Sequence, residues 1–160
     1  MRWLPGIGFL LALLSGAGGF LWWSGDEGLL SATTPQSMLL TTLPACQLDK
    51  GSCQADAGTA RLVLSLSPIP VPVMQPVQVN AELQGFGAVQ TVDIRVTGVN
   101  MYMGEQSAQL QALDESFSRW QGTFMLPLCT SDIMDWLAAV HIATPDGNYQ
   151  VVIPFQTRSR

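Results

Sequence analysis

The chain reads Val-Gln-Val-Asn-Ala-Glu-Leu-Gln from residue 77 to residue 84. Apolar and polar side chains alternate along this stretch, as they do in a β-strand with one buried face and one face in water. The same period of two recurs at residues 62–66 and 92–96, and more weakly at residues 108–113, 120–126, 136–144 and 149–156. Seven short strands separated by turn residues predict an all-β fold, an immunoglobulin-like antiparallel β-sandwich.

Turn and helix positions complete the predicted domain. Four prolines at residues 68–76 exclude a helix there and favour an edge or crossover segment, because proline cannot donate to a strand ladder. Residues 145–148 read Pro-Asp-Gly-Asn and predict a hairpin turn between the last two strands. One short helix is expected from Ser131 to Leu137, where Ser and Asp residues favour a helix N-terminus.

A run without any charged side chain precedes the predicted domain. It extends from Leu4 to Trp23, and about 20 apolar residues suffice for a helix to cross a bilayer core. Arg2 precedes the run, while Asp26 and Glu27 follow it. Because a positive flank stays on the cytoplasmic side, we expect a single N-terminal transmembrane helix at residues 1–24 in an inner membrane. The rest of the chain would then lie in the periplasm.

A cleaved signal peptide is the alternative to this anchor. Ser15-Gly16-Ala17 resembles a cleavage site, but cutting there would leave a very apolar new N-terminus, so we favour the uncleaved anchor. Residues 25–45 lack periodicity and predict a flexible tether. Residues 46–160 are then the sandwich domain, which is exported under either interpretation.

Three cysteines follow the anchor, in a compartment where disulfides persist. Cys46 and Cys53 enclose a short polar loop, and a bond between them would stabilise the fold by roughly 2–3 kcal/mol. This pairing, which we favour, leaves Cys129 as a free thiol. A bond from Cys129 to Cys46 or Cys53 is the alternative, and the sequence does not decide between them.

Composition and missing motifs argue against several classes of protein. The net charge is −5 and no basic cluster is present, so nucleic acid is not an expected partner. His141 is the only histidine, and nothing in the sequence singles out a catalytic partner for it. The chain has no Gly-rich phosphate loop, no Cys-x-x-Cys motif and no His-x-x-x-His pair. We therefore do not expect an enzyme.

Sulfur-bearing residues gather near the end of one predicted strand. Residues 98–105 read Gly-Val-Asn-Met-Tyr-Met-Gly-Glu, and in an extended chain the thioethers of Met101 and Met103 would face the same way. Cys129 and Met134 follow between two later strands. If both segments lie at one end of the sandwich, the four residues form a sulfur-rich pocket, and such soft ligands select Cu(I). The opposing interpretation is that the methionines fill the core.

The segment from Val99 to Gly104 resembles the Met-x-Met-Gly segment of FixH-type proteins. A leucine-containing strand and then Trp-x-Gly-x-Phe at residues 120–124 follow it in the same order. Those proteins are single-pass, periplasm-facing β-sandwich proteins linked to copper-dependent cytochrome oxidase assembly. The resemblance implies metal-binding roles for Met101 and Met103 only, and the three cysteines are not part of its pattern.

Two hypotheses of different classes follow. In the first, a membrane-anchored periplasmic accessory protein binds Cu(I) through Met101, Met103, Cys129 and Met134 and serves a membrane respiratory complex. In the second, the domain is a metal-free interaction module in which residues 101–103 form an adaptable apolar contact surface. The first requires the sulfur atoms to converge, whereas the second requires only that the methionines be exposed together.

Overall fold

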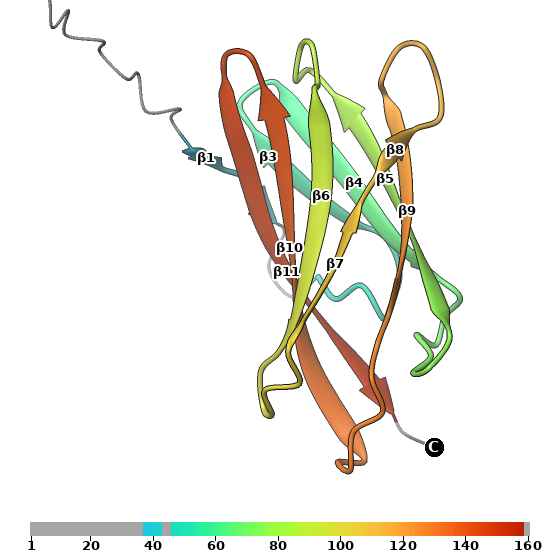
Figure 1. The fold of residues 1–160 in the computed structure, drawn as a ribbon. Helices are drawn as coiled ribbons and strands as arrows, with labels where there is room; N and C mark the ends of the chain where they lie inside the picture. Colours follow the sequence, from blue (N-terminus) through green and yellow to red (C-terminus); the bar gives the residue numbers. More distant parts are fainter. Residues whose placement is uncertain (1–36, 43–45, 159–160) are drawn as a thin grey trace, which may run out of the picture. The chain divides into compact units, whose positions relative to one another are not determined.

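The structure, a computed structural model, describes residues 37–42 and 46–158. The predicted anchor and most of the predicted tether lie outside these residues. All regular elements of the described residues are β-strands, and among them no helix is long and apolar enough to cross a membrane. Two sheets pack face to face around one core (Figure 1). The predicted all-β fold is therefore confirmed.

The first sheet, sheet A, has five strands in the order β1-β11-β10-β6-β7. Neighbouring strands are antiparallel except for β1, which runs parallel to β11. The strands are β1 Ser37–Leu39, β6 Thr91–Gly98, β7 Glu105–Gln109, β10 Ile133–Thr144 and β11 Gly147–Arg158.

The second sheet, sheet B, has six strands in the order β2-β3-β4-β5-β9-β8, and all its neighbours are antiparallel. The strands are β2 Thr41–Thr42, β3 Cys53–Ala57, β4 Ala60–Ser67, β5 Pro76–Gln84, β8 Gln111–Ala112 and β9 Arg119–Met125. The strand predicted at residues 77–84 is β5, which lies between β4 and β9 in the interior of this sheet.

The period of two in the sequence decides which side chains enter the core. From Val77 to Leu83 the apolar residues of β5 are all buried, while the polar residues between them face away from the core. Trp136 of β10 is the largest fully buried side chain and stacks on Phe155 of β11, with ring centroids 6.3 Å apart. Its indole N–H donates to Oγ1 of Thr157 at 2.9 Å, so its polar atom is satisfied within the core.

At two points the chain passes from one sheet to the other, and each crossing covers part of an open edge of the sandwich. The chain passes from β1 to β2 at Leu40 and from β7 to β8 at Leu110. Both leucines are buried, and their N–H groups donate to the carbonyls of Gln150 and Val92 at 2.8 Å each. Edge backbone that is paired in this way cannot recruit strands from other chains.

The sandwich begins earlier in the chain than residue 46. Residues 37–42, within the predicted tether, form β1 and β2, and Leu40 between them is 3% exposed. Two strands of three and two residues are too short to show a period of two, which explains why the sequence pattern does not reveal them.

The helix predicted from Ser131 to Leu137 is wrong. Residues 133–144 form β10, in which Met134, Trp136 and Ala138 are buried in the core. β11 pairs with the whole of β10, and β6 pairs with most of it. A strand held between two partners overrides a local capping pattern, because propensity is weaker than tertiary packing.

The predicted turns agree with the structure. Pro145 and Asp146 join β10 to β11, and the hydroxyl of Thr144 donates to the carbonyl of Gly147 at 2.8 Å. The proline-rich residues 68–75 connect β4 to β5 without a strand or helix. Six of the seven predicted strands are present as single strands, whereas the strand predicted at residues 108–113 is divided between the end of β7 and β8, which lie in different sheets. β1, β2 and β3 have no counterpart among the predicted strands.

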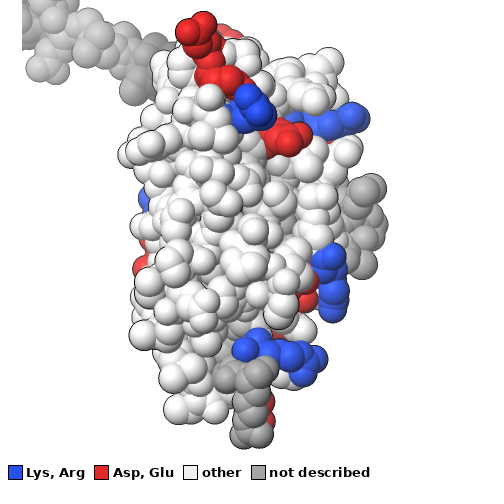
Figure 2. Space-filling model, turned by 90° about the vertical axis from the view of Figure 1, so that its right-hand side faces the viewer, with Lys and Arg blue, Asp and Glu red and all other residues white. Residues whose placement is uncertain are grey.

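Charged side chains are sparse on the side of the molecule next to β9. Figure 2 shows that side with Lys, Arg, Asp and Glu along its margins and with an uncharged middle. The side chains of β9 that face away from the core include Gln121 and Thr123, which are neutral. Electrostatic attraction therefore does not distinguish this side as a binding surface.

Candidate functional site

The two sulfur-bearing segments meet at one end of the sandwich. Residues 99–104 connect β6 to β7, and residues 126–132 connect β9 to β10. Both loops lie at the lower end of the molecule in Figure 1, opposite the hairpin that joins β10 to β11. The geometric condition for a shared pocket, two loops at the same end, is met.

Gly98 lets the first loop fold closely over the end of β6. A Cβ atom at Gly98 would overlap the carbonyl oxygen of Met101 and would lie 3.1 Å from Cε of Met134. Only glycine leaves the backbone room for such an approach. Gly98 therefore brings the loop of Met101 next to the buried side chain of Met134.

Asn100 joins the two segments by its side chain. Its Nδ2 donates to the carbonyl of Ile133 at 3.1 Å, and its Oδ1 accepts from the N–H of Asp135 at 3.2 Å. The N–H of Val99 donates to the carbonyl of Asp135 at 2.8 Å. Three hydrogen bonds thus hold the β6–β7 loop against the start of β10.

Cys129 and Met101 are in direct contact. Sγ of Cys129 lies 3.4 Å from Sδ of Met101, within reach of a thiol that donates to a thioether. Cys129 is 7% exposed and Met101 is 38% exposed. The thiol is therefore covered, while the thioether above it remains accessible from solvent.

The backbone around Cys129 favours the thiolate. The N–H of Ser131 donates to Sγ of Cys129 at 3.5 Å and lowers the pKa of the thiol below its ordinary value. Burial of the sulfur raises the pKa but is a smaller effect, and hydrogen bonds from Thr130 add to the lowering. The thiolate is the form of cysteine that binds metals, so this environment favours ligation.

The other two methionines occupy different places. Met134 is 1% exposed and lies in the core, with its terminal methyl facing Gly98. Met103 is partly buried and packs against the core near the start of β7. The extended conformation that would place Met101 and Met103 on one face is absent, because β6 ends at Gly98 and residues 99–104 form a loop.

The spacing of Met101 and Cys129 is close to that of two ligands of one ion. With metal–sulfur bonds of about 2.3 Å, two sulfurs lie about 3.8 Å apart at tetrahedral geometry and about 4.6 Å apart at linear geometry. The 3.4 Å contact is shorter than the tetrahedral value by about 0.4 Å and shorter than the linear value by about 1.2 Å. A small outward movement of the exposed Met101 side chain would admit an ion.

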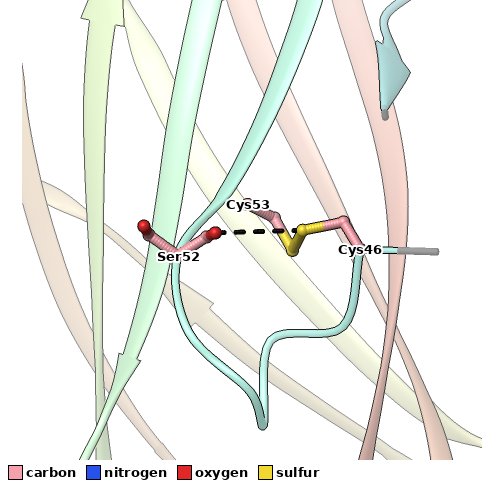
Figure 3. The surroundings of a disulfide bond; sticks show 3 residues. All are labelled: Cys46, Ser52 and Cys53. Atoms are coloured by element: carbon pink, nitrogen blue, oxygen red, sulfur yellow. Dashed lines mark hydrogen bonds between the residues drawn. A yellow bond between two sulfur atoms is a disulfide. The ribbon is translucent and has the colours of Figure 1, made fainter. Parts of the chain in front are cut away.

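The second sulfur pair is covalent. Cys46 and Cys53 form the predicted disulfide, with an S–S distance of 2.01 Å (Figure 3). Sγ of Cys46 also lies 3.8 Å from the carbonyl oxygen of Ser52. A disulfide sulfur carries no hydrogen, so this is a van der Waals contact. The pairing leaves Cys129 as the free cysteine among the described residues.

The loop closed by this disulfide seals the edge of sheet A. Leu48 is fully buried, and its N–H donates to the carbonyl of Pro154 on β11 at 3.1 Å. Oδ1 of Asp49 accepts from the N–H of Gln156 at 3.1 Å. The Cys46–Cys53 bond therefore stabilises the fold, because it holds the loop that places the buried Leu48 between the two sheets.

His141 lies far from the sulfur atoms. It sits in one row with Asp93 and Gln150 across three strands of sheet A, beside a hollow of about 260 Å³ that Arg95 also lines. At about 3.3 Å per residue, it is roughly 23 Å from Met134 along β10. The structure therefore does not bring His141 to the sulfur-bearing loops.

Within the described ranges, no group of three or more His, Cys, Asp or Glu is placed to hold a metal ion. A thioether-based site needs no such group. Comparisons of the chain with protein-family models, with curated proteins and with solved structures each gave no match.

Sequence reasoning missed the residues that shape this site. Gly98 and Asn100 stand in the quoted motif, but only the folded structure reveals the close approach and the hydrogen bonds that they make. A glycine directly after a clear strand is the one local indication of a tight turn. The backbone N–H of Ser131 has no signature in the sequence at all.

Proposed function

We propose that this protein is a membrane-anchored periplasmic accessory protein that binds Cu(I) through Cys129 and Met101. The observation that supports the proposal is the 3.4 Å contact between a covered thiol and an accessible thioether. Thiolate and thioether are the soft ligands that select Cu(I). The resemblance to FixH-type proteins extends the proposal to the assembly of a respiratory oxidase.

The arrangement of the strands supports an immunoglobulin-like sandwich as part of this proposal. The order β4-β5-β9-β8 corresponds to strands A, B, E and D of such domains. The order β7-β6-β10-β11 likewise corresponds to C′, C, F and G. In this scheme the copper ligands lie on the C–C′ and E–F connections.

The site would face away from the point where the chain enters the domain. Ser37, the first described residue, pairs with Asn148 near the β10–β11 hairpin. Met134 pairs with Thr157 at the opposite end of the same two strands, roughly 30 Å away. The proposed ligands therefore lie at the end of the domain opposite β1.

Titration of Cu(I) against a chromogenic chelator, without oxygen, tests the proposal. We expect the purified full chain to bind one equivalent more tightly than about 1 μM, a free energy near −8 kcal/mol. Cys129→Ser should weaken binding at least about 100-fold, because it removes the thiolate. Met101→Leu should weaken it about tenfold, because a neutral thioether binds less strongly.

Met38→Leu is the matched control, since Met38 is 43% exposed and lies on β1 beside Tyr149. Its binding should equal that of the unchanged chain. The proposal fails if the unchanged chain does not compete with the chelator, or if Cys129→Ser retains binding.

A second candidate function has its own supporting observation. Large apolar side chains are exposed on the same two loops and at the start of β10: Val99 58%, Tyr102 81%, Leu128 58% and Ile133 38%. Clusters of exposed apolar residues often mark protein–protein contacts. If copper does not bind, a metal-free interaction module at this end becomes the working hypothesis.

A further inference from the structure

We propose that Asn100 is a positioning residue that holds Met101 against Cys129 and so keeps the thiol covered. The inference deepens the proposed function, on which its prediction for copper affinity rests. Its first readout, access to the Cys129 thiol, does not depend on copper. Asn100 touches neither sulfur, so its role is to place the loop that carries one of them.

The side chain of Asn100 continues the hydrogen bonding between β6 and β10 beyond the point where their backbone pairing ends. The β6–β10 ladder ends with Gly98 opposite Trp136, and the N–H of Val99 adds one bond to the carbonyl of Asp135. Beyond this point the amide of Asn100 donates to Ile133 and accepts from Asp135, at 3.1 and 3.2 Å. An Asn amide has the donor and acceptor of a peptide group, so it can continue a ladder that the backbone has left.

The two sulfur atoms belong to the two segments that the side chain of Asn100 joins. Met101 is the next residue after Asn100, and Cys129 belongs to the loop that leads into Ile133. Holding Asn100 against the start of β10 therefore fixes both ends of the contact between the sulfurs. Without it, the loop of Met101 would be held mainly by the Val99 hydrogen bond, and the cover over Cys129 would open more often.

The rate of Cys129 alkylation by iodoacetamide, measured on the full chain without copper, tests this role. In the unchanged chain the thiol is 7% exposed, and modification must wait for an opening. We expect Asn100→Ala to raise the rate about tenfold, because it removes two solvent-exposed hydrogen bonds. Asn80→Ala is the matched control, since it removes the hydrogen bond that Gln121 donates to Asn80 at 2.9 Å in sheet B.

The conservative variant Asn100→Asp separates positioning from a general loss of structure. A carboxylate still accepts from Asp135 N–H but cannot donate to the carbonyl of Ile133. At neutral pH its alkylation rate should exceed that of the unchanged chain, because only one of the two hydrogen bonds remains.

The proposal is overturned if Asn100→Ala alkylates within twofold of the unchanged chain, or if Asn80→Ala is accelerated equally. It is also overturned if Asn100→Asp alkylates as slowly as the unchanged chain. Copper affinity in Asn100→Ala should fall about tenfold, since the two ligands are no longer held together. A chain that binds no copper but shows the alkylation pattern would refute the proposed function and support the positioning role.

Discussion

The protein brings sulfur next to sulfur at two points, and the two pairs have opposite character. Cys46 and Cys53 are seven residues apart and covalently bonded, and their loop plugs the gap between the sheets. Cys129 and Met101 are 28 residues apart and only in contact, on two loops at one end of the sandwich. The first pair stabilises the fold, whereas the second pair is brought into contact by the fold.

The difference shows how one thiol can stay reduced where disulfides form. A thioether cannot form a disulfide with a thiol, so Met101 covers Cys129 and leaves its thiol unmodified. The other two cysteines are bonded to each other and offer no partner. In the periplasmic location proposed above, a covered thiol beside a neutral soft ligand would keep its capacity for metal binding.

The largest effect should come from breaking the first pair. Cys46→Ala with Cys53→Ala should lower the free energy of unfolding by about 2.5 kcal/mol, because the unfolded chain regains the entropy of an open loop. Urea denaturation measures this change, and copper affinity should stay within twofold. A copper affinity that falls as far as in Cys129→Ser would show that the two pairs are not separate.

A second substitution tests whether copper binding depends on the backbone position of the Met101 loop. Gly98→Ala forces a methyl group against the carbonyl of Met101, so the loop must move. We expect a loss of about 2 kcal/mol in the free energy of unfolding, as in other overpacked sites. Copper affinity should fall at least tenfold in the same variant. Unchanged copper affinity would mean that the position of the Met101 loop does not matter to the ion.

A smaller effect distinguishes the two methionines of the Met-x-Met motif. Met103→Leu should cost under about 1 kcal/mol in stability, because the side chain packs against the core and leucine has a similar volume. Its copper affinity should equal that of the unchanged chain, in contrast to Met101→Leu. Equal losses in both variants would mean that the bound site includes Met103 as well.

The smallest effect concerns the pH dependence of the free thiol. Hydrogen bonding from Ser131 lowers the pKa of Cys129, so its alkylation should rise with pH to an inflection below about 8.5, the ordinary thiol value. Protons compete with Cu(I) for the thiolate, so copper affinity should weaken as pH falls through that lowered pKa. An inflection above the ordinary value would show that burial outweighs the hydrogen bonds.

The regular strands were predictable because apolar and polar residues alternate along them. β5 alternates over its whole length, and each buried position in the sequence is buried in the structure. β1 and β2 are too short for any pattern, and Ile133–Leu137 has helix-capping residues before it but two strands beside it. Tertiary pairing decided these segments, and a single sequence does not contain it.

The candidate site was predictable in its residue types but not in its geometry. Softness of ligands pointed to Met101, Met103, Cys129 and Met134, and the structure places the sulfur atoms of Met101 and Cys129 in contact. It also places Met134 in the core and Met103 against it, which no spacing rule foretold. The deciding features were the glycine turn at Gly98 and the side-chain ladder of Asn100, and both depend on strands distant in sequence.

X-ray absorption at the copper edge, on the full chain loaded with one equivalent of Cu(I), tests the central claim most directly. We predict a first shell that contains sulfur at about 2.3 Å, with one sulfur fewer in Met101→Leu. A shell of nitrogen and oxygen, as His141 and nearby carboxylates would provide, would contradict a site formed by Cys129 and Met101.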